Sequence, residues 1–199
     1  MENVMTDNVG QVDAVLFKRW TDAVALRDAM AELEGRMSER LEKAAESLQP
    51  WLEEQGYSFV EVEAKYARVN VARANWMNKK KQQPCVWIAL DALFPYGFRK
   101  VQEEHPLVWV RTYNLEKDDR RVFQEHLTNR LRGKGGDWIN EDCSRDYPAG
   151  HYIATHGDRE RLALAQDPEA LATFAREALA SILILGDDVE AALQETLGK

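Results

Sequence analysis

Residues 57–65 read YSFVEVEAK, and the character of the chain changes at this point. Apolar side chains alternate with charged ones along the second half of this stretch: Val60, Glu61, Val62, Glu63, Ala64 and Lys65. Alternation with a period of two residues is typical of a β-strand that has one buried and one solvated face. We therefore expect a sheet that packs on a core with one face and carries charge on the other.

More strand-like segments follow in the chain. Residues 66–76 alternate in the same way, with Arg68 and Asn70 opposite the apolar side chains, and residues 107–113 form another candidate strand. Residues 85–90 are a continuous apolar run, which is typical of a strand covered on both faces. A polar, basic loop is expected at 77–84 and a last strand at 151–155. Short connections between these segments predict an antiparallel sheet of four to five strands.

The segment before residue 56 has a helical pattern. Residues 13–48 contain no proline and one glycine, and an apolar stripe runs along them at steps of three and four: Ala23, Leu26, Met30, Leu33, Met37, Leu41, Ala44, Leu48 and Trp51. Such spacing is heptad-like, with one extra residue after Met37, close to Gly35. We expect Pro50 to close this helical segment, because proline removes a backbone hydrogen bond inside a helix.

The length of this segment raises two alternatives. Thirty-six helical residues would span about 54 Å, whereas a compact domain of this chain length is only about 42 Å across. Either the helix breaks near Gly35 into a helical hairpin, or it stays straight and meets a partner. The sequence leaves both alternatives open.

Helical patterns also close the chain. Asp118 or Asp119 is expected to cap a helix that runs to about Leu131. Another helix is expected to begin at Pro168, after the capping residue Asp167, and to pause at Gly186. The order of elements predicts an α+β protein with a long N-terminal helical segment, an antiparallel sheet and a helical C-terminus. We divide it into a helical segment, residues 1–55, which offers an assembly surface, and an α+β body, residues 56–199, and expect the two to form one domain.

Composition excludes several classes of protein. The 199 residues include 26 Lys and Arg against 34 Asp and Glu, a formal net charge of −8, which argues against a disordered tail protein and a wholly basic nucleic-acid coat. Two cysteines outside any CxxC spacing indicate a reducing compartment. The longest apolar run, residues 178–185, is too short to cross a membrane. We expect a cytoplasmic protein with no membrane contact.

The charge is unevenly distributed. Residues 64–90 carry six basic side chains and no acidic one, between acidic flanks. Basic and aromatic side chains in alternation are typical of a surface that binds nucleic acid or another acidic partner. The candidate binding residues are Arg68, Arg73, Trp76, Lys79, Lys80 and Lys81. The alternative, which we favour, is that Trp76 belongs to the core and that the cations pair with acids of the N-terminal helix: Glu39, Glu42, Glu46 or Glu53.

Glu63-Ala64-Lys65 places an acid and a lysine two residues apart on an expected strand. This step resembles the second half of the PD-(D/E)xK nuclease pattern, although the Asp of a preceding strand is missing and Asp91 would have to substitute. The resemblance implies a Mg²⁺-dependent nuclease that uses Glu61, Glu63, Lys65 and Asp91. A solvated strand face or a cross-strand ion pair explains the same residues, and we favour that interpretation.

The sequence thus favours a non-catalytic interaction protein without a metal site or cofactor. It would associate with itself or with a protein partner through the stripe from Ala23 to Trp51, and would offer the basic segment to an acidic partner. A metal-dependent nuclease and a nucleic-acid-binding module without chemistry are the alternatives.

Overall fold

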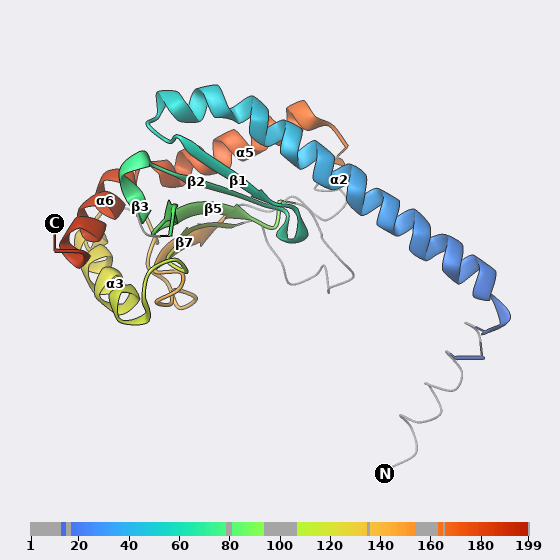
Figure 1. The fold of residues 1–199 in the computed structure, drawn as a ribbon, viewed down its shortest axis with the longest axis horizontal. Helices are drawn as coiled ribbons and strands as arrows, with labels where there is room; N and C mark the ends of the chain where they lie inside the picture. Colours follow the sequence, from blue (N-terminus) through green and yellow to red (C-terminus); the bar gives the residue numbers. More distant parts are fainter. Residues whose placement is uncertain are drawn as a thin grey trace, which may run out of the picture. The chain divides into compact units, whose positions relative to one another are not determined.

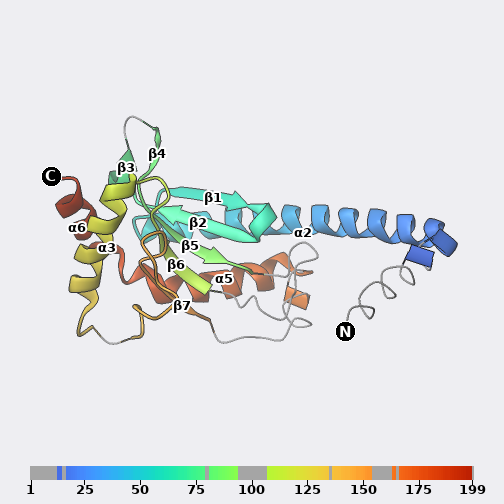
Figure 2. The same cartoon turned by 90° about the horizontal axis from the view of Figure 1, so that it is seen from below.

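The computed structural model describes residues 13–14, 17–78, 81–93, 107–134, 136–153, 163–164 and 166–198 (Figures 1 and 2). The chain divides into two compact units, Met1–Met37 and Ser38–Lys199. The division falls inside the long helix α2, Trp20–Glu54. None of the described helices is both long enough and apolar enough to cross a membrane.

The second unit is built on a five-stranded sheet, and Figures 1 and 2 show it from two directions. Its strands, in spatial order, are β1 (Phe59–Glu63), β2 (Arg68–Ala72), β5 (Trp87–Asp91), β6 (Leu107–Arg111) and β7 (Ala149–Tyr152). Every neighbouring pair is antiparallel. The predicted α+β class and antiparallel sheet are therefore confirmed. The expected loop at 77–84 also contains a small two-stranded sheet, β3 (Met77–Asn78) with β4 (Gln83–Pro84).

The register gives the sheet two chemically different faces. Residues that pair directly across strands point to the same side, and Val62 pairs with Val69 while Glu63 pairs with Arg68. The core face carries Val60, Val62, Val69, Val71, Ile88, Leu90, Val108 and Val110. The polar face carries Glu61, Glu63, Arg68, Asn70, Trp87, Asp91, Trp109 and Arg111. The alternation read from the sequence predicted this division for β1 and β2.

Two helices cover the core face. Beyond Met37, helix α2 buries one side through Leu41, Leu48 and Leu52, and its Ala45 lines a small cavity together with Val60 of β1. Helix α5, Pro168–Leu183, contacts β5 and β6. The Arg176 guanidinium of α5 lies 5.2 Å from the centre of the Trp51 ring of α2.

Two further helices, α3 (Lys117–Leu131) and α6 (Gly186–Thr196), pack side by side next to the sheet (Figures 1 and 2). Their junction includes an ion pair between Arg130 and Glu195. Helix α6 also contacts the short 3₁₀ helix η2, Ala74–Trp76. This contact brings the C-terminal helix to the end of β2.

The helix boundaries follow local chemistry in most places. Asp167 caps α5, because its carboxylate accepts hydrogen bonds from the backbone N–H groups of Glu169 at 2.9 Å and Ala170 at 3.2 Å. The expected pause at Gly186 separates α5 from α6. Helix α3 begins at Lys117, so Asp118 and Asp119 lie in its first turn and the expectation that one of them caps it is wrong; no side chain caps this helix.

The expectation that Pro50 closes the N-terminal helix is wrong, because α2 continues through Pro50 to Glu54. Proline costs one backbone hydrogen bond in a helix. Leu48 and Leu52, on either side of Pro50, are buried, and their packing offsets that loss. The helix also continues through Gly35. Of the two alternatives for this segment, the structure has the unbroken helix.

Candidate functional site

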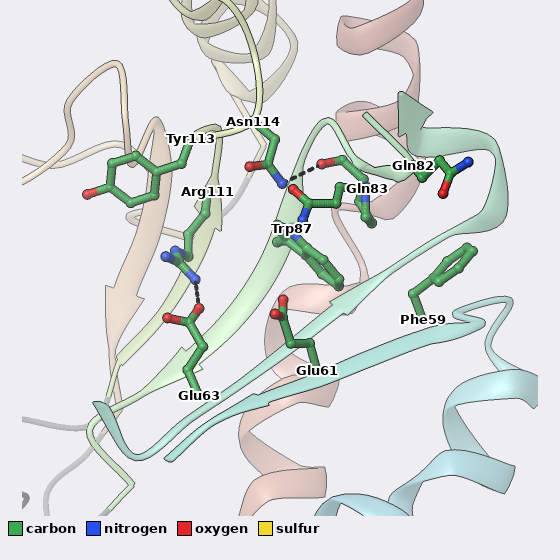
Figure 3. Close-up of a pocket in the computed structure, with 10 residues that line it drawn as sticks. Phe59, Glu61, Glu63, Gln82, Gln83, Trp87, Arg111, Tyr113 and Asn114 are labelled. Atoms are coloured by element: carbon green, nitrogen blue, oxygen red, sulfur yellow. Dashed lines mark hydrogen bonds and ion pairs between the residues drawn. The ribbon is translucent and has the colours of Figure 1, made fainter. Parts of the chain in front are cut away.

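A pocket of about 420 Å³ opens on the polar face of the sheet (Figure 3). Its walls combine aromatic, amide, acidic and basic side chains: Phe59, Trp87 and Tyr113; Gln82, Gln83 and Asn114; Glu61 and Glu63; and Arg111, with Pro84 at the edge. These residues come from β1, β4, β5 and β6 and the turns beside them. Segments far apart in the sequence therefore build the pocket together.

Glu63 is the centre of a hydrogen-bond network at the base of this pocket. Its Oε1 accepts hydrogen bonds from Nη1 of Arg111 at 2.8 Å and from Nδ2 of Asn70 at 2.7 Å. Its Oε2 accepts from Nη1 of Arg68 at 3.1 Å. Both carboxylate oxygens of Glu63 are therefore engaged by protein donors.

The network continues to a second carboxylate. Arg68 also donates from Nε to Asp91, and Arg111 donates to Oδ1 of Asn70 at 2.7 Å. Arg68, Asp91 and Arg111 are all more than 90% buried. Two guanidinium groups and two carboxylates make the network neutral, and burial of such charges is tolerated only when each one has a partner.

The two carboxylates respond differently to their surroundings. Burial opposes ionisation of Glu63, but hydrogen bonds from Arg111 and Asn70, together with the charges of Arg68 and Arg111, lower the pKa of Glu63 to about 2. Burial raises the pKa of Asp91, and the hydrogen bond from Arg68 offsets that rise only in part. Glu63 is thus the firmly ionised member of the network.

Aromatic rings lie against both guanidinium groups. The guanidinium carbon of Arg111 lies 5.2 Å from the centre of the Tyr113 ring, and that of Arg68 lies 4.8 Å from the centre of the Tyr66 ring. Tyr113 in turn packs edge-on against Tyr147 at 5.4 Å. Each buried arginine of the polar face is therefore held by a carboxylate and by an aromatic face.

The acid-x-Lys step does not form the arrangement that the nuclease resemblance implies. Strand β1 ends at Glu63, and Lys65 lies in the 3₁₀ helix η1, Ala64–Tyr66. The Lys65 ammonium is 5.4 Å from the centre of the Tyr66 ring. Glu63 and Asp91 do converge, but on the guanidinium of Arg68. Within the described segments, no three His, Cys, Asp or Glu side chains form a group that could hold a metal ion.

Three of the four cations of the basic segment that the structure describes form internal ion pairs. Beyond Arg68, Nη1 of Arg73 lies 2.7 Å from Asp187 and 3.1 Å from Glu190 of α6. Lys81 lies 2.7 Å from Glu116. These partners differ from the acids of the N-terminal helix that the sequence suggested.

The remaining candidate binding residues of the basic segment are Trp76, Lys79 and Lys80. Trp76 is fully buried and packs edge-on against Tyr57, with 5.8 Å between the ring centres. It therefore lies in the core, as the favoured interpretation expects. Lys79 and Lys80 lie outside the described residues.

The N-terminal part of α2 exposes large apolar side chains. Trp20 is 62% exposed, Leu26 63% and Leu33 40%. Leu26 and Leu33 belong to the stripe that the sequence identified, and from Met37 to Leu48 that stripe is buried. The same pattern of residues thus forms a core contact in one part of the helix and an exposed surface in another.

Sequence reasoning missed Arg111, Asn70 and Trp87 as site residues. All three lie at alternate positions on strands, facing the same side as Glu61 and Glu63. The period of two would place each residue on the polar face. It could not show that Arg111 approaches Glu63, because the two lie on strands that are not neighbours in the sheet.

Comparison of the chain with family models, with curated proteins and with solved structures found no match.

Proposed function

We propose that this chain is a non-catalytic interaction protein that forms a homodimer through the N-terminal part of α2. The interface is the assembly stripe, Ala23, Leu26, Met30 and Leu33. The observation that carries the proposal is the exposure of Leu26 and Leu33 at heptad positions of a continuous helix. Apolar side chains at a and d positions associate when a second helix covers them.

The magnitudes favour a weak dimer. Leu26, Met30 and Leu33 from two chains would contribute roughly 9–18 kcal/mol if each side chain were fully covered. Association costs about 4–15 kcal/mol in lost translational and rotational freedom. The midpoints of the two ranges differ by about 4 kcal/mol, which corresponds to a dissociation constant of about 1 mM.

The charges beside the assembly stripe favour a parallel pair. With Leu26 and Leu33 at d positions, Asp22 of one copy lies at a g position and faces Arg27 of the other at an e position. In the antiparallel register that pairs Leu26 with Met30, the two Arg27 side chains would face each other. Like charges at that position oppose pairing.

The other parts of the sequence-based interpretation receive less support. Arg68, Arg73 and Lys81 already have acidic partners within the chain, so an acidic partner would rely on Lys79 and Lys80. The nuclease alternative needs Glu63 as a metal ligand, yet both of its oxygens accept hydrogen bonds from protein donors. Cleavage of DNA with Mg²⁺ or Mn²⁺ that disappears in Glu63→Ala would contradict a non-catalytic function.

Sedimentation equilibrium between about 50 µM and 3 mM, a range that brackets such an affinity, tests the proposal. The mass of the full chain should rise from 22.8 kDa toward twice that value. Leu26→Lys/Leu33→Lys should remain monomeric, because lysine keeps the helix but places charge in the assembly stripe. Ala25→Lys/Ala31→Lys adds the same charge at exposed positions outside the stripe and should still dimerise. A lysine double variant in the stripe that dimerises like the wild type contradicts the proposal.

A further inference from the structure

Glu61 differs from the other carboxylates of the polar face. It lines the pocket, its side chain is exposed, and it points toward Trp87 (Figure 3). Glu63 and Asp91 are both held by arginines, whereas none of the described residues donates a hydrogen bond to Glu61 or forms an ion pair with it. The pocket therefore contains one carboxylate beyond those that the internal network neutralises.

The aromatic side chains of the pocket lie beside this carboxylate. Phe59 precedes Glu61 by two residues on β1 and so lies on the same face, and Trp87 extends from β5 into the same space. Gln82 and Gln83 border the pocket on the side of Phe59 and Trp87 (Figure 3) and are exposed. A carboxylate, aromatic faces and amide oxygens are the groups that bind an organic cation.

The internal network of the polar face shows which cation a carboxylate and an aromatic ring bind together. Arg111 is bound by the Glu63 carboxylate and lies over Tyr113, and Arg68 is bound by Asp91 and lies over Tyr66. A planar guanidinium can pair with a carboxylate through two N–H groups and stack on an aromatic ring at the same time. An ammonium group cannot stack in this way.

We propose that the pocket binds the arginine side chain of a partner peptide. Its guanidinium pairs with Glu61 and stacks on Trp87, and its outer N–H groups reach the amide oxygens of Gln82 or Gln83. The volume of about 420 Å³ lies in the range of small-ligand pockets. The single extra negative charge of the pocket and the formal net charge of −8 favour a cation over a phosphate group.

Titration followed by ¹H–¹⁵N NMR of the full chain tests this inference, with N-acetyl-arginine-methylamide as the probe. The citrulline analogue, which has the same shape without the charge, is the control ligand. The arginine probe should shift the indole resonance of Trp87 with a dissociation constant of about 1 mM, as expected for one side chain, and citrulline should bind at least about tenfold more weakly.

Two variants locate the site. Glu61→Gln should weaken arginine binding about tenfold, because it removes the charge at constant shape. Glu177→Gln, at an exposed position of α5 outside the pocket, should leave binding unchanged. An unchanged dispersion of the amide spectrum shows that each variant is folded.

Other outcomes overturn the inference. Equal binding of the arginine and citrulline probes would show that charge is not recognised. Binding of guanosine monophosphate without binding of arginine would point to a nucleotide, and unchanged affinity in Glu61→Gln would place the cation elsewhere. The inference does not depend on dimerisation, so Leu26→Lys/Leu33→Lys should bind the arginine probe with wild-type affinity.

Discussion

Glu63 holds the polar face together at the scale of single residues. Three donors from two strands converge on its carboxylate, and two of them belong to arginines that are more than 90% buried. Loss of one partner of a buried ion pair leaves the other charge uncompensated. The contribution of Glu63 is therefore larger than that of the surface pairs elsewhere in the chain, such as Arg121 with Glu125.

We predict that Glu63→Gln lowers the free energy of unfolding by about 2–3 kcal/mol at pH 7, somewhat less than for a fully buried pair. Gln keeps the shape and can still accept one hydrogen bond, but it leaves Arg68 and Arg111 with less negative charge. Urea denaturation measures the difference. Glu125→Gln, which breaks an exposed pair, is the matched control and should change stability by less than about 1 kcal/mol.

The difference in unfolding free energy between wild type and Glu63→Gln should also change with pH, in a direction that follows from the pKa of Glu63. The pKa of Glu63 is about 2 in the folded chain and 4.5 ordinarily. Its stabilisation is therefore fully present above pH 4.5 and is lost as the pH falls toward 2. Wild type and Glu63→Gln should converge in stability across that interval. A difference between them that stays constant with pH would contradict this account of the network.

At the scale of elements, Gly150 allows β7 to pair closely with β6 beside the Trp109 ring. A Cβ at this position would lie 2.5 Å from the carbonyl oxygen of Val108 and 2.6 Å from Cε3 of Trp109. The strand pairing of β6 with β7 places Gly150 directly opposite Trp109. Only a residue without a side chain fits there.

We predict that Gly150→Ala destabilises the fold by about 1–3 kcal/mol, because a backbone oxygen and a packed ring must both shift. Thermal unfolding measures the effect. Gly35→Ala is the matched control, since no atom lies within 4 Å of its Cβ position, and it should be neutral or stabilise helix α2 by up to about 1 kcal/mol. Equal effects of the two substitutions would show that the close approach at Gly150 costs nothing.

The element scale also shows what local pattern can predict. The strict alternation around Val60 and Val62 predicted the strand and the side of it that faces the core. The end of that strand was missed because the turn at 64–67 contains no glycine or asparagine, although Ala67 has φ of 46°. Pro50 was misread for a different reason, since tertiary packing of Leu48 and Leu52 overrides the local preference of proline.

Prediction of the candidate site requires contacts between residues that are far apart in the sequence. Alternation predicts that Glu61, Glu63 and Asn70 share a face, and this much follows from each strand alone. The approach of Arg111 to Glu63 depends on the order of strands in the sheet and on register across 48 residues of sequence. No local signal in the sequence contains that order.

At the scale of the whole molecule, most cations of the basic segment that the structure describes are neutralised within the chain. Arg68, Arg73 and Lys81 find acids on β1, β5 and α6 and beside α3. Within the described residues, large apolar side chains are exposed on the N-terminal part of α2, and Glu61 of the pocket has no ion-pair partner. Both features are typical of a protein that binds other chains, and the first of them is the basis of the proposed dimer.

Cysteine cross-linking tests the proposed dimer most directly. In a parallel pair, Leu26 of one copy meets Leu26 of the other, so Leu26→Cys should form a covalent dimer under mild oxidation. Background from the native cysteines should be low, because Cys85 is buried and burial raises the pKa of the Cys143 thiol. Ala25→Cys, on the neighbouring face of the same helix, should remain largely monomeric under the same conditions. Failure of Leu26→Cys to cross-link faster than Ala25→Cys would contradict assembly through this stripe.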